Sequence, residues 1–183
     1  MLYSFANFSV PLWHKQKIMS KIKLFLTDVD GCMTDGGMYY CPNGDELKRF
    51  SVYDGMGLLL LRKAGIPCGI ITSEITSIVE HRAKKLHVDY LYMGVGRVID
   101  NVTKSKLEVA QEICDQLGIT LQEVCYVGDD VNDWDLLTHV GFPVCPPNAV
   151  QKIKEIPNIL VLQTPGGHGA IREIAEKILA ENE

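Results

Sequence analysis

Two carboxylates, Asp28 and Asp30, follow a short apolar run and precede Gly31. Like charges this close repel, and burial would raise the pKa of at least one of them unless a cation lies nearby. In an extended backbone residues two apart point to the same side, and glycine lets the chain turn close to a ligand. A carboxylate can attack a phosphoryl group, and a second one can protonate the leaving oxygen and later activate water. The stretch is therefore a candidate site for phosphate chemistry around a cation.

Other polar residues could complete such a site. Asp129 and Asp133 lie in the sequence GDDVND, and their acidity suits Mg²⁺, a hard cation that prefers oxygen ligands. Thr72 or Ser73 can donate a hydrogen bond to a phosphoryl oxygen, and Lys106 is the candidate cation for the remaining phosphate charge. A lone DxDG or GDD is a common turn sequence. The prediction therefore depends on the order and spacing of all these polar residues along the chain.

Composition narrows the class of partner. The 183-residue chain has a net charge of −5, which offers no electrostatic reason to expect nucleic acid or an anionic membrane. No segment reaches the length of a membrane span. The 6 cysteines lack the spacing of a zinc site, and we expect them to be reduced in a cytoplasmic protein. We predict a flexible N-terminal extension over residues 1–20 and one domain over residues 21–183.

Strand-like and helix-like segments alternate along the chain. We expect a β-hairpin within residues 37–52, strands at 22–27, 67–72, 88–93, 123–128, 142–145 and 158–162, and helices at 55–65, 75–86, 104–118, 131–141, a short one from 149, and 169–181. The pattern predicts an α/β fold, a doubly wound, Rossmann-like parallel sheet with helices on both faces. Ligands of such sheets bind beyond the carboxyl ends of the strands, where Asp28, Thr72 and Asp129 all fall.

Four segments resemble, in order, the motifs of the haloacid dehalogenase superfamily over roughly residues 21–180: DVDGCMTDG, IITSE, Lys106 and GDDVNDWDLL. The resemblance implies that Asp28 is the nucleophile and a Mg²⁺ ligand. It implies that Asp30 is the general acid and base, with its backbone carbonyl on the metal, and that Asp129 is a further ligand.

The same resemblance assigns the neighbouring polar residues. It implies that Thr72 and Lys106 hold the phosphate, that Asn132 takes part in substrate binding, and that Asp133 is a supporting residue. Receiver domains also combine an acidic cluster with Thr and Lys on a doubly wound sheet, but DxDG is not their pattern. A non-catalytic, phosphate-binding member of the superfamily remains the third hypothesis.

The spacing of the motifs leaves no room for a cap domain. Residues 31–71 hold only the hairpin and one helix, and residues 73–105 hold a helix, a strand and the loop 94–105. An open site cannot exclude water by itself, so we expect a neighbouring subunit to cover it, with the hairpin as contact.

The segments DGGMYY, FSVYDGMG and GGHGAIRE resemble the capless branch that hydrolyses 2-keto-3-deoxy sugar acid phosphates and is typically tetrameric. That branch includes octulosonate 8-phosphate enzymes of lipopolysaccharide synthesis and nonulosonate 9-phosphate enzymes of sialic-acid-like pathways. It implies a homotetramer in which the segment around His168 reaches an adjacent active site. It also implies that five consecutive residues line the substrate site: Ser51, Val52, Tyr53, Asp54 and Gly55.

Glu74 and Lys85 resemble the nine-carbon branch at their two positions, although Ser73 replaces the usual glycine. Lys85 or Arg82 could pair with the substrate carboxylate, and Glu74 could accept hydrogen bonds from sugar hydroxyls. Alternatively Glu74 only favours the N-terminus of the helix at 75–86, Lys85 is solvated, and the substrate is the eight-carbon 8-phosphate.

Overall fold

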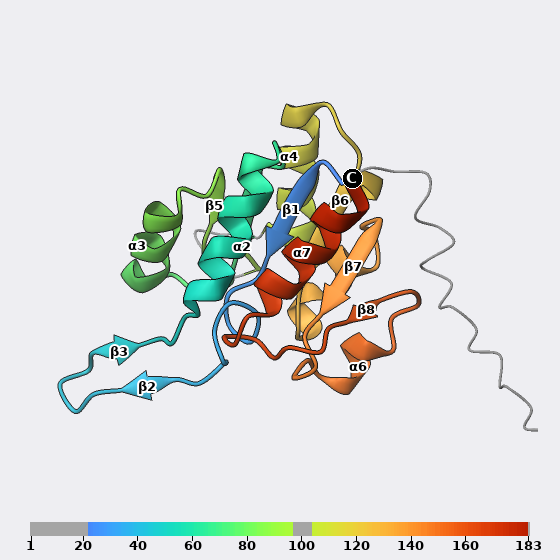
Figure 1. The fold of residues 1–183 in the computed structure, drawn as a ribbon. Helices are drawn as coiled ribbons and strands as arrows, with labels where there is room; N and C mark the ends of the chain where they lie inside the picture. Colours follow the sequence, from blue (N-terminus) through green and yellow to red (C-terminus); the bar gives the residue numbers. More distant parts are fainter. Residues whose placement is uncertain (1–21, 97–103, 183) are drawn as a thin grey trace, which may run out of the picture.

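The computed structural model describes residues 22–96 and 104–182, so the expected extension at residues 1–20 and most of the loop before Lys106 lie outside the described residues. Six strands form one sheet in the order β5-β4-β1-β6-β7-β8, and every neighbouring pair is parallel (Figure 1). The strands are β1 (Leu24–Thr27), β4 (Cys68–Ile71), β5 (Tyr90–Tyr92), β6 (Val124–Val127), β7 (Phe142–Cys145) and β8 (Leu160–Val161).

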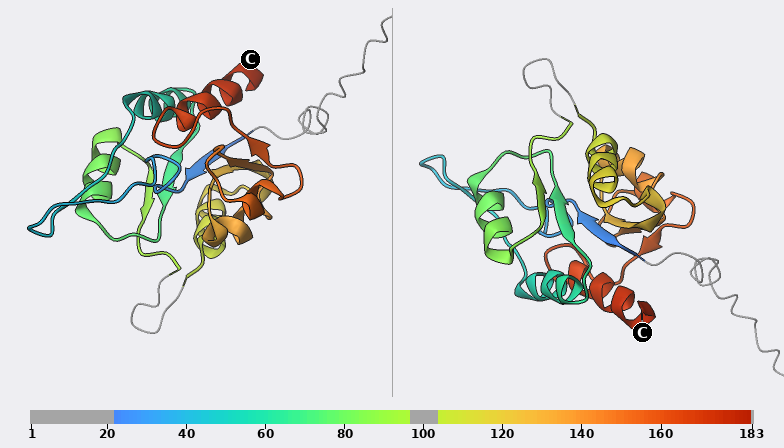
Figure 2. Two further views of the ribbon diagram at one scale, coloured as in Figure 1. Left: turned by 90° about the horizontal axis from the view of Figure 1, so that it is seen from below. Right: turned by 90° about the horizontal axis from the view of Figure 1, so that it is seen from above.

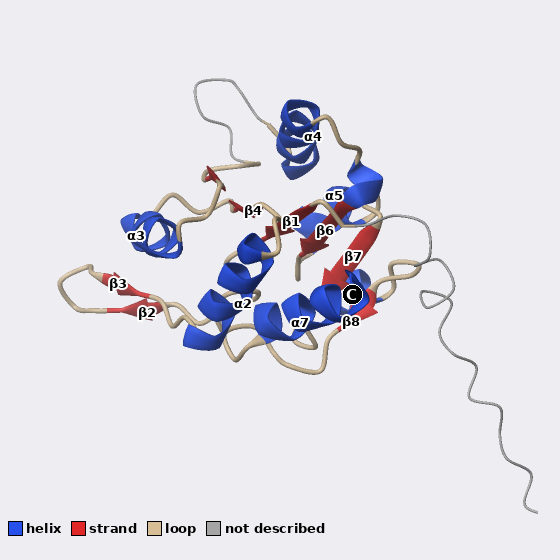
Figure 3. Ribbon diagram, turned by 45° about the horizontal axis from the view of Figure 1, so that its top comes forward, coloured by secondary structure: helices blue, strands red, loops and turns tan. Residues whose placement is uncertain are grey.

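Helices cover both faces of the sheet, as Figures 2 and 3 show. One face carries α2 (Val52–Lys63), α3 (Ser77–Leu86) and α7 (Ala170–Asn182), and the other carries α4 (Lys106–Leu117), α5 (Trp134–Leu137) and α6 (Gln151–Lys154). Along β1, Phe25 packs into the first core while Leu24 and Leu26 pack into the second, because side chains alternate between the faces of a strand. The doubly wound α/β fold is confirmed. Among the described helices, none combines the length and apolar character needed to cross a bilayer.

The strand order places the carboxyl ends of β1 and β6 beside each other. The chain winds from β1 through β4 to β5, then returns to β6 on the other side of β1. Thr27 is level with Val127 in the β1–β6 register, and Asp28 N donates to Val127 O at 2.9 Å. Such a reversal of winding opens a crevice at the carboxyl edge, which is where doubly wound sheets bind ligands. Two motifs about 100 residues apart, at Asp28 and Asp129, therefore meet there.

The predicted hairpin forms from two short antiparallel strands, β2 (Tyr39–Tyr40) and β3 (Glu46–Leu47), and it projects from the rest of the fold (Figure 1). An isolated antiparallel bridge between Thr34 and Phe50 closes its base. The described residues contain no cap domain over the carboxyl edge of the sheet, as expected.

Three local features differ from the sequence expectations. Helix α2 begins at Val52, earlier than expected, because the Ser51 side chain accepts from Tyr53 N and caps it. The helix expected over 131–141 is a 3₁₀ turn, Val131–Asp133, followed by α5, which ends at Leu137. The Thr138 hydroxyl donates to backbone carbonyls of the preceding turn, which competes with continued helix. A 3₁₀ turn at Leu121–Glu123 was not expected.

Candidate active site

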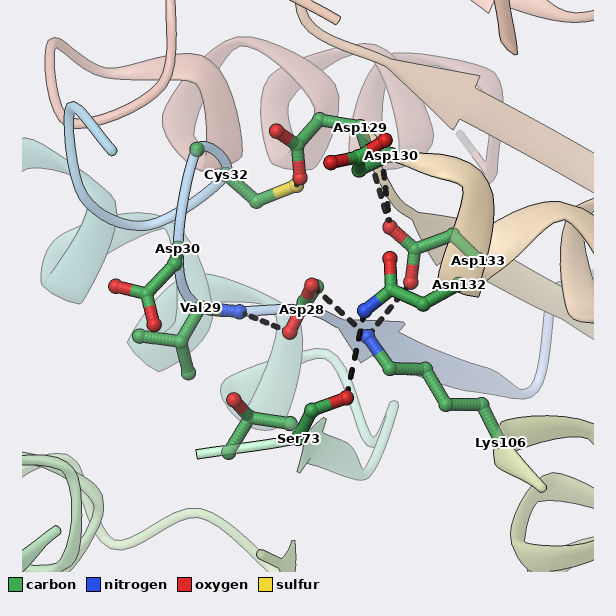
Figure 4. A network of polar contacts seen from close by, with 12 residues as sticks. Asp28, Val29, Asp30, Cys32, Ser73, Lys106, Asp129, Asp130, Asn132 and Asp133 are labelled. Atoms are coloured by element: carbon green, nitrogen blue, oxygen red, sulfur yellow. Dashed lines mark hydrogen bonds and ion pairs between the residues drawn. The ribbon is translucent and has the colours of Figure 1, made fainter. Parts of the chain in front are cut away.

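Asp28 lies directly after β1 and is 5% exposed (Figure 4). Its Oδ1 accepts from Val29 N at 2.7 Å, and its Oδ2 lies 2.8 Å from Lys106 Nζ. Burial raises the pKa of Asp28 to about 6, with Lys106 opposing the shift and Asp133 adding to it. The carboxylate is therefore desolvated and oriented before any ligand arrives.

Lys106 is the first residue of α4, and its side chain is buried between two carboxylates. Nζ lies 2.8 Å from Asp28 Oδ2 and 2.7 Å from Asp133 Oδ1. Burial alone would lower the pKa of Lys106, but the charges of Asp28 and Asp133 raise it, so the ammonium group stays charged. A capping box of Ser105 and Glu108 starts the helix at this point and so sets where the lysine emerges.

Asp133 is fully buried and uses both carboxylate oxygens within the protein. Oδ1 accepts from Lys106 Nζ and from the Tyr126 hydroxyl, and Oδ2 accepts from Asp129 N at 2.8 Å and Asp130 N at 3.2 Å. Its oxygen also lies within 4.8 Å of oxygens of Asp28 and Asp129. Because four donors already occupy it, its geometry suits the predicted supporting role better than that of a metal ligand.

Asp129 rests against the tight turn that follows β1. Gly31 has φ +82°, and a Cβ there would lie 2.0 Å from Asp129 Oδ2, so only glycine allows this approach. The Cys32 thiol donates to Asp129 Oδ1 at 3.5 Å. Burial, with the charges of Asp133 and Asp28, raises the pKa of Asp129 to about 7.

These residues fit a divalent cation. Asp28 and Asp129 present desolvated carboxylate oxygens to one point, and in the described chain no ion pair of Asp129 with a protein cation is found. Burial, followed by repulsion from neighbouring carboxylates, raises both pKa values, and a hard cation would stabilise the charged forms. All-oxygen ligation is what Mg²⁺ prefers. The Asp30 side chain is not part of this carboxylate group, so only its backbone carbonyl remains as a predicted ligand.

A cleft of about 380 Å³ opens above the two carboxylates. Asn132 Nδ2 donates to Ser73 Oγ at 3.3 Å (Figure 4), and the buried Thr72 also lines the cleft. The structure thus brings residues from three of the motif segments to one cleft, and Lys106, the remaining motif residue, pairs with Asp28 of that cleft. The chemical roles of these residues stay predictions. The lining residues are Asp28, Asp30, Gly31, Gly36, Thr72, Ser73, Glu74, Asp129, Asp130, Val131 and Asn132.

The segment 51–55 does not line this cleft within one chain, so its contact with substrate stays a prediction. Asp54 is 1% exposed and its Oδ1 accepts from Arg172 N at 3.1 Å, so it caps the start of α7. Gly55 allows close packing, because a Cβ there would lie 2.9 Å from Leu86. Val52 and Tyr53 are 76% and 67% exposed on the outer surface of α2.

Three further candidate substrate-binding residues, Arg82, Lys85 and His168, also lie outside the cleft of their own chain. Arg82 Nη2 donates to Ser51 O at 2.8 Å, and its guanidinium covers the Phe50 ring. Lys85 is exposed on α3. His168 Nε2 lies 3.0 Å from an Arg49 nitrogen at the base of the hairpin. A contact of these residues with substrate stays a prediction.

Two residues near the site were missed by sequence reasoning. Tyr126 donates to Asp133 from inside β6, and Lys48 forms an ion pair with Asp30 from the hairpin. A phenol on a fully buried strand was a usable signal, because a buried hydroxyl needs a partner. Nothing in the hairpin sequence distinguishes Lys48 from a solvated lysine.

Comparisons with known proteins agree with this geometry. A family model described as haloacid dehalogenase-like hydrolase matches residues 48–141, just over half of the chain. The 3-deoxy-D-manno-octulosonate 8-phosphate phosphatase KdsC of Escherichia coli K12 is 35% identical over 159 residues, which are 86% of this chain and 79% of the relative. The chain belongs to the haloacid dehalogenase-like hydrolases.

Solved structures extend the likeness over nearly the whole chain. The 3-deoxy-D-manno-octulosonate 8-phosphate phosphatase of Moraxella catarrhalis, in complex with magnesium, phosphate and KDO, is 34% identical with a TM-score of 0.83, covering 94% of this chain and 93% of that one. The cobalt-bound Haemophilus influenzae phosphatase is 30% identical with a TM-score of 0.79, covering 88% and 89%. This haloacid dehalogenase-like hydrolase is a phosphoric monoester hydrolase, and Mg²⁺ is its cofactor.

The affinity of this hydrolase for Mg²⁺ should fall below pH 7. The pKa values of about 7 for Asp129 and about 6 for Asp28 are both raised, so below them the carboxyls carry protons that the ion must displace. We expect roughly tenfold weaker apparent binding per pH unit for each displaced proton. Isothermal titration calorimetry in two buffers of different ionisation enthalpy measures both affinity and proton release. Equal affinity at pH 5.5 and 8 would contradict the prediction.

Proposed function

We propose that this enzyme hydrolyses the phosphate monoester of a 2-keto-3-deoxy sugar acid through an aspartyl-phosphate intermediate. The observation that carries the proposal is the buried Asp28 carboxylate, held by Lys106 at the floor of an open cleft and beside Asp129. A desolvated, oriented carboxylate at that position is suited to attack phosphorus. Mg²⁺ bound by Asp28, Asp129 and the Asp30 carbonyl would offset the charge of the phosphate.

The chain's own residues supply the proton transfers. A carboxylate oxygen of Asp28 forms the new bond to phosphorus while the bond to the sugar oxygen breaks, and Asp30 gives its proton to that oxygen. The deprotonated Asp30 then takes a proton from water, whose oxygen attacks the aspartyl-phosphate. Inorganic phosphate leaves and the Asp28 carboxylate is restored. Thr72, Ser73 and Asn132 line the cleft with Asp28, and Lys106 pairs with Asp28, which supports the proposed roles of these residues in holding phosphate.

The sugar acid class is supported by the relatives, which are named for the eight-carbon 8-phosphate. Within that class we propose the nine-carbon 9-phosphate as the better substrate, because Glu74 and Lys85 resemble the nine-carbon branch and Glu74 lines the cleft. Because Lys85 is exposed on its own chain, we propose that it contacts the substrate only in an assembled oligomer. The eight-carbon substrate is the second candidate, favoured by the names of the relatives.

We also propose a cytoplasmic homotetramer. Six free cysteines support a reducing compartment. The hairpin and the nearby starts of α2 and α3 expose an unusual number of large apolar side chains, and such patches mark protein interfaces. A second copy on this surface would cover the open cleft. The exposed residues are Met38, Tyr39, Tyr40, Leu47, Val52, Tyr53, Met56 and Ile75.

Asp28→Asn should abolish Mg²⁺-dependent release of phosphate from p-nitrophenyl phosphate and from the sugar acid phosphate. The amide keeps the shape of the side chain but is a very poor nucleophile, so we expect a loss of at least ~1,000-fold, ~4 kcal/mol in barrier. Phosphate assay and thermal unfolding measure activity and folding. Asp45→Asn, an exposed change in the hairpin turn, is the matched control. Retained turnover by Asp28→Asn would reject the nucleophile.

The ratio of kcat/KM for the two sugar acids tests the substrate. We expect at least a tenfold preference for the nine-carbon 9-phosphate, ~1.4 kcal/mol in barrier. Glu74→Ala should reduce that preference, because it removes a hydrogen-bond acceptor from the cleft wall. A tenfold preference of the unaltered enzyme for the eight-carbon 8-phosphate would instead establish the second candidate.

Light scattering should find four copies per particle. Tyr40→Glu, at a hairpin side chain that is 68% exposed, should shift the enzyme toward smaller species and lower its turnover. Leu117→Glu, a change at a 37% exposed leucine on α4, is the control. A monomer at micromolar concentration would contradict the assembly.

A further inference from the structure

The four aspartates that the proposed site uses differ in their electrostatic partners. Lys106 pairs with Asp28 and Asp133, and Asp129 faces the position of the divalent cation. Asp30 pairs with a different cation, Lys48, which the proposed chemistry has not used.

Lys48 reaches the active site from the hairpin. Its side chain has no exposed surface, and Nζ lies 2.8 Å from Asp30 Oδ1 and 3.3 Å from Glu46 Oε1. Nearby hairpin side chains differ: Tyr40 and Leu47 are 68% and 59% exposed. A buried ammonium group needs close anionic partners, and Lys48 has two.

The two oxygens of Asp30 are in different situations. Oδ1 accepts from Lys48 Nζ and from the Thr34 hydroxyl at 3.2 Å. Among the described residues no donor binds Oδ2, and the Asp30 side chain is 27% exposed on the cleft wall. One oxygen is thus tethered by the protein, which leaves the other for the leaving oxygen and then for water.

We propose that Lys48 is a positioning residue that holds the Asp30 carboxyl in the geometry needed for proton transfer. The inference rests on the proposed function and deepens it. The ammonium group keeps its own proton, and the proton that moves to the sugar oxygen is that of Asp30. Because Lys48 belongs to the hairpin, the position of the hairpin then determines the orientation of the Asp30 carboxyl. Proton transfer requires alignment within hydrogen-bond reach, so a freely rotating Asp30 would be a poor acid.

Lys48→Met removes the ammonium group while keeping a long, unbranched side chain. For the sugar acid phosphate, whose leaving alkoxide must be protonated, we expect kcat/KM to fall about 100-fold. For p-nitrophenyl phosphate, whose phenolate leaves without a proton, we expect a fall of less than about 5-fold. The ratio kcat/KM reports the steps up to departure of the leaving group, so the two substrates isolate the acid step.

A mutant cycle with Asp30→Asn shows whether Lys48 acts through Asp30. In that background Lys48→Met should cause no further loss on the sugar acid phosphate, because the group that it positions is already gone. Lys23→Met is the control: Lys23 pairs with Glu123 at the amino end of the sheet and should leave both substrates unaffected. If Lys48→Met does not fold, Lys48→Gln takes its place with the same expectation.

Equal losses on the two phosphates, or full additivity with Asp30→Asn, would overturn the inference and leave the proposed function standing. An unaltered enzyme that releases phosphate from neither substrate would overturn both.

Discussion

The active site depends on one buried cation. Lys106 lies between the carboxylates of Asp28 and Asp133, and all three side chains are almost inaccessible to water. Removing one partner of such a group typically costs about 3–5 kcal/mol, because it leaves an uncompensated buried charge. The lysine therefore connects Asp28, the proposed nucleophile at the end of β1, to the polar turn after β6. Asp133 extends the same network to the amides of Asp129 and Asp130, which orients the second carboxylate of the metal site.

The sheet topology makes this contact possible. Since the winding direction reverses between β1 and β6, their carboxyl ends open a crevice instead of being covered by a crossover helix. Gly31 then lets the turn after β1 lie directly against Asp129, with no room for a Cβ. Strand order and one glycine thus bring two like charges together, and a divalent cation would offset their repulsion.

The hairpin contributes to the same site from outside the sheet. Lys48 reaches Asp30, and Arg49 donates to Gly167 O at 3.2 Å and lies beside His168. The hairpin is therefore held both to the catalytic loop and to the segment before α7. Its outer surface is apolar and exposed. A second subunit bound there would therefore contact the hairpin, which holds the proposed general acid. In the proposed tetramer, assembly would therefore affect the proposed proton transfer by Asp30.

The sequence by itself determined the fold class and the residues at the carboxyl edge, Asp28, Thr72 and Asp129 among them. Apolar runs that end in polar residues are local patterns, and parallel topology collects their ends at one edge. Only the tertiary structure decided which charges are partners. Lys48 and Asp30 are 18 residues apart, and Asp54, expected at the substrate, caps a helix 118 residues away. No local pattern encodes such pairs, because burial and distance arise only when the elements pack.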